Sequence, residues 1–326
     1  MKILFVCSGN LSNFNPSPFI QVQGDSLRRR GEDITYYKVR GTGFKGYFRN
    51  ITPLKKIIDH NKFDIIHAHY ALCSWVSVLT FTDIPIVTSF MGSDVYGYYD
   101  GNGRLRIDSI KNIILSQMLQ FFTGSIIVKS ENIKKYIKFS NHLHVLPNGV
   151  DISMFKPINK EKARKKLKLP SNKKIVLFLA SKKLKRKNYR LVKSALNILD
   201  DDIKICCPYP VEHELVPYYY NAADVTLLSS YNEGSPNIIK EAMACNCAIV
   251  TTNVGDVEWV LGNTKGCYIS SFTPQDFAEK INSALTYSNK HNKTNGRRRI
   301  FKLGLDSETV ALKLISIYKS VLNGNN

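Results

Sequence analysis

At 326 residues the chain exceeds the usual size of a single hydrophobic core, so we expect two domains. Its 44% hydrophobic and 22% charged residues exclude a disordered or collagen-like chain. A formal net charge of +20 favours polyanionic or phosphorylated partners, but the basic runs are scattered and do not form the single arm of a nucleic-acid-binding tail.

Strand-like and helix-like segments alternate through the first 146 residues. Gly31 ends the first expected helix, and Thr52 is expected to cap a helix that begins at Pro53. This alternation is typical of a parallel sheet with covering helices. We expect strands at 3–7, 34–39, 65–68, 86–90, 125–128 and 144–146, and helices at 17–30, from 53, and at about 108–121.

Turn-forming residues interrupt the alternation at 147–151, so we place a boundary there, between domains at 1–150 and 151–326. The predicted fold is α/β, with two tandem Rossmann-like, doubly wound domains and a ligand cleft between them. We expect strands in the second domain at 175–180, 203–206, 225–228, 248–251 and 267–269. Helices are expected at 189–199, at 213–220, from 274, and at about 307–322, the last able to pack back on the first domain.

The stretch EGSPNIIKEAMACNCAIV, which begins at Glu233, contains a helix start. Ser235 is expected to cap a helix whose first residue is Pro236. The first amides, at Asn237 and Ile238, have no acceptor within the helix and lie at the positive end of its dipole. The sequence therefore predicts an anion site there, with phosphate as the expected guest.

Two carboxylates flank this helix start. Glu233 precedes it in a loop, and Glu241 follows Ser235 by six residues, a rise of roughly 9 Å along the helix. This spacing suits a nucleotide sugar, with one carboxylate on sugar hydroxyls and the other on the ribose beyond the diphosphate. The alternative is two ordinary exposed glutamates.

The seven cysteines have neither the spacing of a disulfide framework nor that of a zinc site, which indicates a reducing cytosol. No apolar run reaches the length of a membrane span, and the apolar run in the N-terminal segment is too short for a signal peptide. We expect a cytoplasmic protein. Basic residues 28–30 and the basic, aromatic segment 44–49 would suit a peripheral contact with an anionic membrane face, or form an ordinary solvated face.

The chain resembles, over nearly its whole length, a family 4 retaining glycosyltransferase of the GT-B fold. The E-x7-E pattern from Glu233 to Glu241 carries most of the resemblance, with Asn221 to Val225 before it and Thr252 to Asp256 after it. The segment LPNGVD, which ends at Asp151, is similar to the inter-domain joint of that family.

The resemblance implies donor-site roles. Glu233 would contact the donor sugar, Glu241 would bind the ribose, and the backbone of Gly234, Ser235, Pro236, Asn237 and Ile238 would reach the sugar and phosphate. Lys187 matches a family lysine that neutralises the leaving diphosphate, and Lys182 stands where the family has an arginine. Because a lysine lacks the bidentate fork of arginine, Lys183 or Arg186 would share that work.

In the first domain the resemblance is weaker. Met91 stands where relatives often place a histidine beside the sugar, so either His69, Asp94 or a backbone group would replace it on the acceptor side, or the enzyme would dispense with this contact. His67 is expected in the core. Gly9 would let the backbone approach the diphosphate, although this loop has a single glycine.

The implied reaction is transfer of a sugar, with retention, from a nucleotide sugar to a hydroxyl of a glycan or lipid-linked acceptor in surface polysaccharide biosynthesis. We expect neither metal nor other cofactor, because no D-x-D motif is present and fixed positive groups stabilise the leaving group. An epimerase or phosphorylase on the same fold is the main alternative. No G-x-G-x-x-G supports a nucleotide-cofactor oxidoreductase, and no helix-turn-helix or RNP-like signature supports a nucleic-acid partner.

Overall fold

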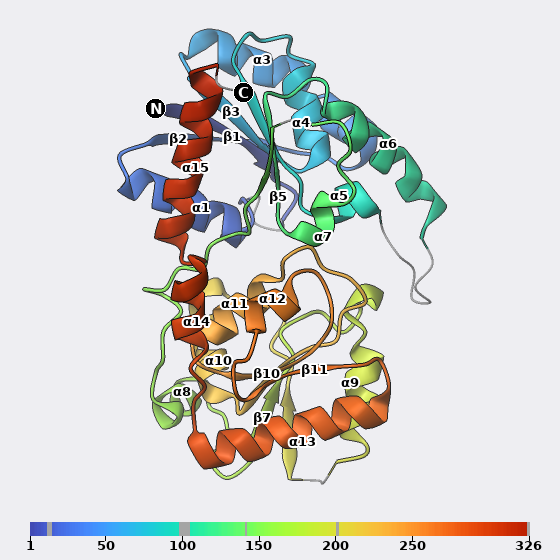
Figure 1. Cartoon of the computed structure of the whole chain (residues 1–326), viewed down its shortest axis with the longest axis vertical. Coiled ribbons are helices and arrows are strands. Elements are labelled where there is room, and N and C mark those ends of the chain that lie inside the picture. The colour runs from blue at the N-terminus through green and yellow to red at the C-terminus, as the bar shows by residue number, and fades with distance from the viewer. Residues whose placement is uncertain (12–14, 98–104, 141, 200–201, 325–326) are drawn as a thin grey trace. The chain divides into compact units, whose positions relative to one another are not determined.

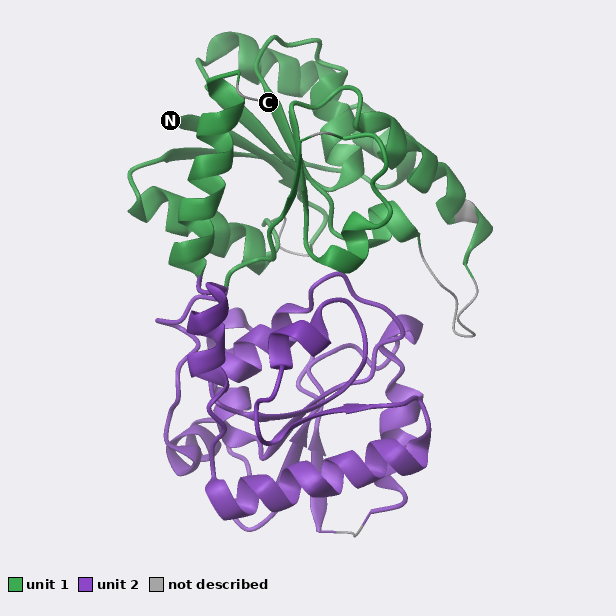
Figure 2. Ribbon diagram, viewed as in Figure 1, with its two compact units in different colours: residues 1–98, 105–149, 307–326 green, residues 99–104, 150–306 purple. Residues whose placement is uncertain are grey.

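A computed structural model describes residues 1–11, 15–97, 105–140, 142–199 and 202–324 (Figure 1). The described parts of residues 1–98, 105–149 and 307–326 form one compact unit, unit 1, and those of 150–306 form unit 2 (Figure 2). The chain thus leaves unit 1 at Gly149 and returns to it at Ser307. No helix among the described residues has the length and apolar character needed to span a bilayer.

Unit 1 is built on a parallel sheet with the strand order β2-β1-β3-β4-β5-β6. Val6 in the middle of β1 lies opposite Tyr37 and Ala68 in the two neighbouring strands. Residues 3–7 are fully buried because helices cover both faces of the sheet. The strands are β1 (Lys2–Ser8), β2 (Asp33–Val39), β3 (Ile65–His69), β4 (Ile86–Ser89), β5 (Ser125–Val128) and β6 (Leu143–Val145).

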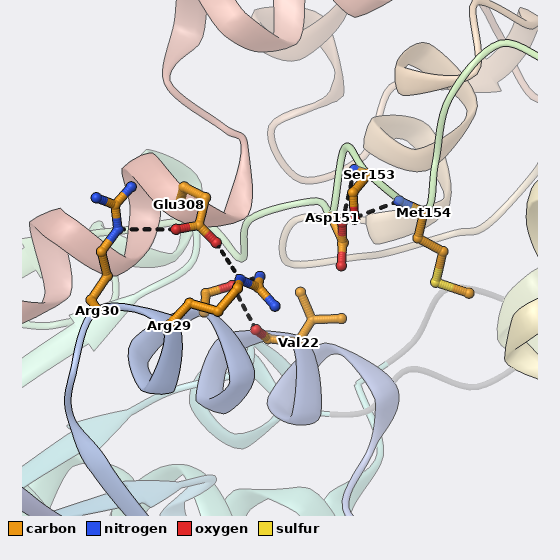
Figure 3. A network of polar contacts seen from close by, with 8 residues as sticks. Val22, Arg29, Arg30, Asp151, Ser153, Met154 and Glu308 are labelled. Atoms are coloured by element: carbon orange, nitrogen blue, oxygen red, sulfur yellow. Dashed lines mark hydrogen bonds and ion pairs between the residues drawn. The ribbon is translucent and has the colours of Figure 1, made fainter.

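Helices α1 (Pro18–Arg29) and α15 (Ser307–Leu322) cover the face of β1 that bears Ile3 and Phe5. Arg29 and Arg30 both donate to Glu308 at the start of α15, at 2.7 and 3.0 Å, which joins the two helices (Figure 3). The remaining helices of unit 1 are α2 (Gly43–Phe48), α3 (Ile51–His60), α4 (Ala71–Val78), α5 (Ser93–Tyr96), η1 (Ile107–Ser109), α6 (Ile110–Leu119) and α7 (Glu131–Lys134).

Unit 2 has a five-stranded parallel sheet with the order β11-β10-β9-β7-β8. Its strands are β7 (Lys174–Leu177), β8 (Ile203–Cys206), β9 (Val225–Leu228), β10 (Ala248–Thr252) and β11 (Cys267–Ser270). The helices are α8 (Lys160–Lys166), η2 (Lys185–Lys187), α9 (Tyr189–Leu196), η3 (His213–Leu215), α10 (Val216–Ala222), α11 (Asn237–Ala244), α12 (Val257–Leu261), α13 (Pro274–His291) and α14 (Gly296–Leu303).

Asp224 fixes the entry of the chain into this sheet. Its carboxylate accepts from Arg164 and Lys160 of α8, at 2.7 and 2.8 Å, and from the amide of Ile175 in β7 at 2.6 Å. Asp151 orders the first turn of unit 2 in a similar way, because its Oδ1 accepts from the amides of Ser153 and Met154 (Figure 3).

Several predicted helix boundaries were wrong. Helix α3 begins at Ile51 with Asn50 at its N-cap, so Thr52 is not the cap; the Asn50 side chain donates to the carbonyl of Gly46 instead. The helix expected at 108–121 is η1 followed by α6, and the one expected at 213–220 is η3 followed by α10. Seven short helices, α2, α4, α5, α7, α8, α12 and α14, were not predicted because their patterns are short or apolar throughout.

The aromatic side chains expected to suit a membrane face in segment 44–49 belong to the core instead. Tyr47 is 8% exposed, and Phe44 and Phe48 pack against the same hydrophobic cluster as Leu54 and Leu72. The membrane contact expected for this segment therefore lacks its apolar anchors.

Candidate functional site in unit 2

The carboxyl ends of β7 and β9 bring a basic loop and an acidic loop together. The Ser229 hydroxyl donates to the carbonyls of Lys187 and Asn188, at 2.8 and 3.1 Å, and the amide of Tyr231 donates to the carbonyl of Arg186 at 2.9 Å. These bonds hold the loop after β7 against the loop after β9, so that their side chains meet.

Glu233 is the meeting point of these loops. Its Oε1 accepts from Lys187 Nζ at 2.5 Å, from Ser230 Oγ at 2.8 Å and from Arg186 Nη1 at 3.0 Å. Burial raises the pKa of Glu233, but the charges of Lys187 and Arg186 outweigh it and hold the pKa below its ordinary value. The carboxylate is therefore ionised at neutral pH, next to two cations.

Of the basic residues proposed for this site, Lys187 and Arg186 reach Glu233, whereas Lys182 and Lys183 are not among its described donors. Lys182 is exposed and lies over the ring of Tyr189, with its Nζ 4.9 Å from the centroid. Lys183 is exposed as well. Of the two residues expected to share the work of Lys182, Arg186 therefore contacts Glu233, whereas no contact of Lys183 with Glu233 is among the described ones.

The helix that follows this loop starts one residue later than predicted. Helix α11 begins at Asn237, Pro236 occupies the N-cap position, and no side chain caps it. Ser235 is not the cap, because its hydroxyl donates to Asp256 Oδ2 at 2.6 Å and accepts from Lys240 Nζ at 3.0 Å. The first amides of α11 consequently stay available to an anion.

Buried polar groups underlie the start of α11. Lys240 is 1% exposed, and burial lowers its pKa to about 8 despite the opposing charges of Asp256 and Glu241. Asp256 Oδ1 and Asn237 Oδ1 are two of the four buried side-chain atoms without a partner in the described part of the chain. Such orphaned atoms are uncommon in folded proteins and mark places where a ligand or water completes the bonding.

Glu241, one helical turn further, points toward the core side of α10. Its Oε2 accepts from the hydroxyl of Tyr220 at 2.8 Å, and Tyr220 is fully buried. Burial raises the pKa of Glu241 above its ordinary value, and the Tyr220 hydrogen bond and the charge of Lys240 only partly oppose this shift. Tyr220 was missed by sequence reasoning, because YYYNA in isolation indicates only an apolar helix.

Gly255 lets the loop after β10 approach the acidic loop. A Cβ at this position would lie 2.5 Å from the carbonyl oxygen of Gly234 and 2.9 Å from that of Glu233, and its φ is +59°. Only glycine fits both constraints without strain.

Candidate functional site in unit 1

The carboxyl ends of β3, β4 and β5 gather a second buried polar group. His67 is a core residue as predicted, with Nδ1 at 2.5 Å from the Tyr318 hydroxyl and Nε2 at 2.8 Å from Ser89 Oγ. Its ring stacks on that of His69, at 4.1 Å between centroids. Lys129, which directly follows β5, donates to Ser89 Oγ at 3.3 Å and is 2% exposed. Lys129 was not predicted, since a single lysine after a strand is not distinctive.

His69 ends β3 with its Nε2 buried and without a partner among the described residues. Burial and the nearby Lys129 charge hold the pKa of His69 well below its usual range, so its imidazole is neutral at pH 7. A neutral, unpartnered ring nitrogen at a strand end can accept a hydrogen bond from a hydroxyl or, in the other tautomer, donate one to it.

Asp94 and Gly9 have structural partners that account for them. The Asp94 carboxylate accepts from the amides of Gly92 at 2.8 Å, Met91 at 2.9 Å and Ala71 at 3.2 Å, and burial raises its pKa to about 6 although these bonds oppose the shift. Asp94 therefore orders the loop after β4.

Gly9 donates its amide to the carbonyl of Val39, and a Cβ at position 9 would lie 2.8 Å from Lys38 Cβ. The close approach of β2 therefore accounts for a glycine at this position.

Comparison with known proteins then assigns the chain and its fold to a family. Residues 162–287 match the family described as "Glycosyl transferases group 1", and residues 18–154 match "Glycosyltransferase Family 4". The chain belongs to the family 4 glycosyltransferases, with the GT-B fold.

Individual relatives agree with this assignment. TuaC of Bacillus subtilis, named for a role in teichuronic acid biosynthesis, is 27% identical over 240 residues, which cover 67% of this chain and 60% of TuaC. The chain spans 60–64% of the length of the first curated relatives it matches.

Solved structures share the fold at low identity. Sucrose-phosphate synthase of Thermosynechococcus elongatus superposes with a TM-score of 0.79 at 17% identity, covering 99% of both chains. HepE of Anabaena, solved in complex with UDP, gives 0.75 at 15% identity and covers 98% of this chain and 100% of its own.

Proposed function

We propose that this glycosyltransferase moves a hexose from a nucleotide-sugar donor to a hydroxyl of a glycan or lipid-linked acceptor, with retention of anomeric configuration, in surface polysaccharide biosynthesis. One observation carries the proposal. Lys187 and Arg186 converge on Glu233 directly before the uncapped start of α11, and Glu241 follows one helical turn later.

The donor would lie along this arrangement. The diphosphate would take the amides of Asn237 and Ile238, and the cations of Lys187 and Arg186 would neutralise charge as the bond from the anomeric carbon to the phosphate oxygen breaks. The three described donors to Glu233 all reach Oε1, so Oε2 would be the oxygen that accepts from a sugar hydroxyl. Glu241, held by Tyr220, would accept from the ribose hydroxyls.

On the acceptor side, we assign the unpartnered Nε2 of His69 to the acceptor hydroxyl. Because its imidazole is neutral, His69 would orient that hydroxyl rather than carry charge. The proton would pass to the departing phosphate oxygen as the new glycosidic bond forms. The reaction would need no metal ion and no other cofactor.

Two relatives favour the finer parts of the proposal. HepE of Anabaena has been solved with UDP-glucose, which supports a nucleotide-sugar donor for this fold. The name of TuaC associates a relative with the synthesis of a polysaccharide. A cytoplasmic location stays a prediction.

The donor site is tested by a pair of glutamate variants. A thermal-shift screen of nucleotide sugars first identifies the donor, and transfer and hydrolysis are then measured. We expect Glu241→Ala to weaken donor binding and Glu233→Ala mainly to slow turnover, because one carboxylate binds the ribose and the other faces the reacting sugar.

Glu279→Ala, which removes an exposed glutamate of α13, is the matched control. Unchanged kinetics in both site variants would refute the assignment. Formation of an isomerised sugar with free nucleotide, rather than transfer to an acceptor, would instead identify an epimerase. Product analysis of the same reactions by NMR distinguishes these results and reports the anomeric configuration.

A further inference from the structure

Two aromatic side chains of unit 2 stack on each other beside the acidic loop. The rings of Tyr231 and Phe272 lie 5.5 Å apart between centroids, with an interplanar angle of 23°. Tyr231 precedes Glu233 by two residues, and Phe272 follows β11 by two residues and is 47% exposed. Neither ring is among the members of the two hydrophobic clusters described for unit 2. This pair, the aromatic platform, therefore lies outside the core.

The order of the strands explains why these two rings meet. Strand β10 lies between β9 and β11. The last residue of β9, Leu228, is in register with Thr251 of β10. The last residue of β11, Ser270, is in register with Thr252 of β10. The carboxyl ends of the three parallel strands thus share one edge of the sheet, which is where open parallel sheets bind their ligands.

Hydrogen bonds fix the Tyr231 end of the platform. The amide of Tyr231 donates to the carbonyl of Arg186 at 2.9 Å. The carbonyl of Ser230 accepts from the hydroxyl of Thr252 at 2.7 Å, which ties the loop after β9 to the end of β10.

Asp276 fixes the Phe272 end. Its Oδ2 accepts from the amide of Ser271 at 2.6 Å and from the hydroxyl of Ser270 at 2.9 Å. Both loops are thus ordered before any ligand binds, so a ligand on the two rings would lose little affinity to the cost of arranging them.

A half-exposed aromatic stack suits the apolar face of a pyranose ring. The face of an aromatic ring carries partial negative charge and attracts the weakly positive C–H groups on one side of a sugar. The sugar hydroxyls at the rim then need polar partners. Asn253, which directly follows β10, and Ser271 and Thr273, which flank Phe272, are exposed and supply carboxamide and hydroxyl groups.

The place of the platform in the sheet separates it from the proposed diphosphate and base sites. Lys187 and Arg186 follow β7, which lies beyond β9 in the strand order. The platform extends from β9 to β11, so its centre is about two strand spacings, roughly 10 Å, from β7. A nucleobase would lie beyond the ribose at Glu241, whereas Tyr231 lies on the other side of Glu233 along the chain. A sugar that is not bonded to the diphosphate fits this position best.

We propose that the aromatic platform binds a pyranose residue of the acceptor glycan, away from the hydroxyl that receives the transferred hexose. This assignment rests on the proposed transferase function, and it makes the acceptor a chain of several sugar residues. The chain would stack the C–H face of one residue on Tyr231 and Phe272.

The test is saturation-transfer NMR of the full chain with cellotetraose, a neutral chain of β-linked glucopyranose residues. Mannitol, a polyol without a ring, is the control ligand, and no nucleotide is added. We expect transfer to cellotetraose and none to mannitol. The transfer should be strongest at the axial hydrogens on one face of the glucose ring, because only that face would lie on the aromatic rings.

Variants at Phe272 separate stacking from apolar bulk. Phe272→Leu keeps an apolar side chain without a ring and should weaken cellotetraose binding by about 5-fold or more, whereas Phe272→Tyr should bind like the wild type. Phe301→Leu, at a position of α14 that is also 47% exposed, is the matched control and should not weaken binding. Glu233→Ala removes the carboxylate proposed for the donor sugar and should also keep cellotetraose binding.

Four results would each overturn the proposal: no transfer from the wild type to cellotetraose, equal transfer to mannitol, equal weakening in Phe272→Leu and Phe301→Leu, or loss of binding in Glu233→Ala but not in Phe272→Leu. The last result would place the sugar in the donor site. Circular dichroism and melting temperatures verify that each variant is folded. Binding is measured without donor or turnover, so its outcome is independent of the transferase assay.

Discussion

Tyr220 sets the environment of a proposed ribose-binding carboxylate. Its hydroxyl donates to Glu241 at 2.8 Å in a buried setting. Tyr220→Phe would leave that carboxylate without this donor and raise its pKa further, so we expect the donor KM to rise roughly 5- to 100-fold, most at low pH, with kcat largely kept. The measurement is donor kinetics across pH 5 to 8.

Tyr219→Phe, at the neighbouring position of α10, is the control and should leave the donor KM near the wild-type value. A fall in kcat at constant KM in the Tyr220 variant would contradict a positioning role for this hydroxyl.

A second prediction at the scale of single residues concerns Lys240, whose titration makes the stability of the folded chain depend on pH. Burial lowers its pKa in the folded chain to about 8, from 10.5 for an ordinary lysine. Between these values the unfolded chain binds more protons, so this lysine makes folding more favourable as pH rises. The stability of the wild type relative to Lys240→Met should therefore increase by about 3 kcal/mol from pH 7 to above 10.

Urea unfolding at pH 7 and pH 10 measures this difference. Lys204→Met, which removes an exposed lysine of β8, controls for the loss of one charge. A stability difference for Lys240→Met that stays constant with pH would show that the buried amine does not titrate in this window.

Site residues could be predicted from the sequence only where side chains of one kind stand at a recognisable spacing along the chain. Glu233 and Glu241 stood out because eight positions separate two carboxylates around a helix start. Arg186 and Lys187 meet Glu233 from 47 and 46 residues away, and such a meeting depends on how two loops fold. Lys129 was missed for the same reason.

At the scale of elements, the loop after β10 supports the acidic loop through Gly255. Gly255→Ala would strain a residue with φ of +59° and push its Cβ against the carbonyl of Gly234. We expect the free energy of unfolding of unit 2 to fall by roughly 1–3 kcal/mol. Donor binding should also weaken, because the acidic loop must move. Thermal melting with and without nucleotide measures both effects.

Gly31→Ala is the matched control, since Gly31 has a φ of +86° but no atom within 4 Å of the added Cβ. Gly31→Ala should lower stability only by the cost of backbone strain and should leave nucleotide binding unchanged. If the two variants behaved alike, contact with the acidic loop would not be the reason for glycine at position 255.

Elements were predictable where hydrophobic periodicity is strong. The strands β5, β8 and β9 have the predicted bounds because short β-branched runs lie between polar turns. Helix α4, ALCSWVSV, is almost entirely buried and so has no polar face to give it a helical period. Helix α12 has five residues, too few for any period to be detected.

At the scale of the whole molecule, the path of the chain makes unit 1 depend on its last helix. Helix α15 was predicted, and so was its packing on the first domain. The residues it contacts were not: Tyr318 bonds to His67, 251 residues earlier. Leu314, fully buried, belongs to the same hydrophobic cluster as Ile3 and Phe5 of β1. The cluster combines the two ends of the chain, with unit 2 inserted in the sequence between them.

Leu314→Ala should therefore destabilise unit 1 by about 2–5 kcal/mol, the usual cost of a cavity at a buried leucine. Hydrogen exchange read by mass spectrometry should become faster in peptides from β1 and β3 and stay unchanged in those from β9 and β10, because the hydrophobic clusters of unit 2 contain no residue of α15. Leu312→Ala, half exposed two positions earlier, should alter neither set. Faster exchange in both units would mean that they unfold as one cooperative body.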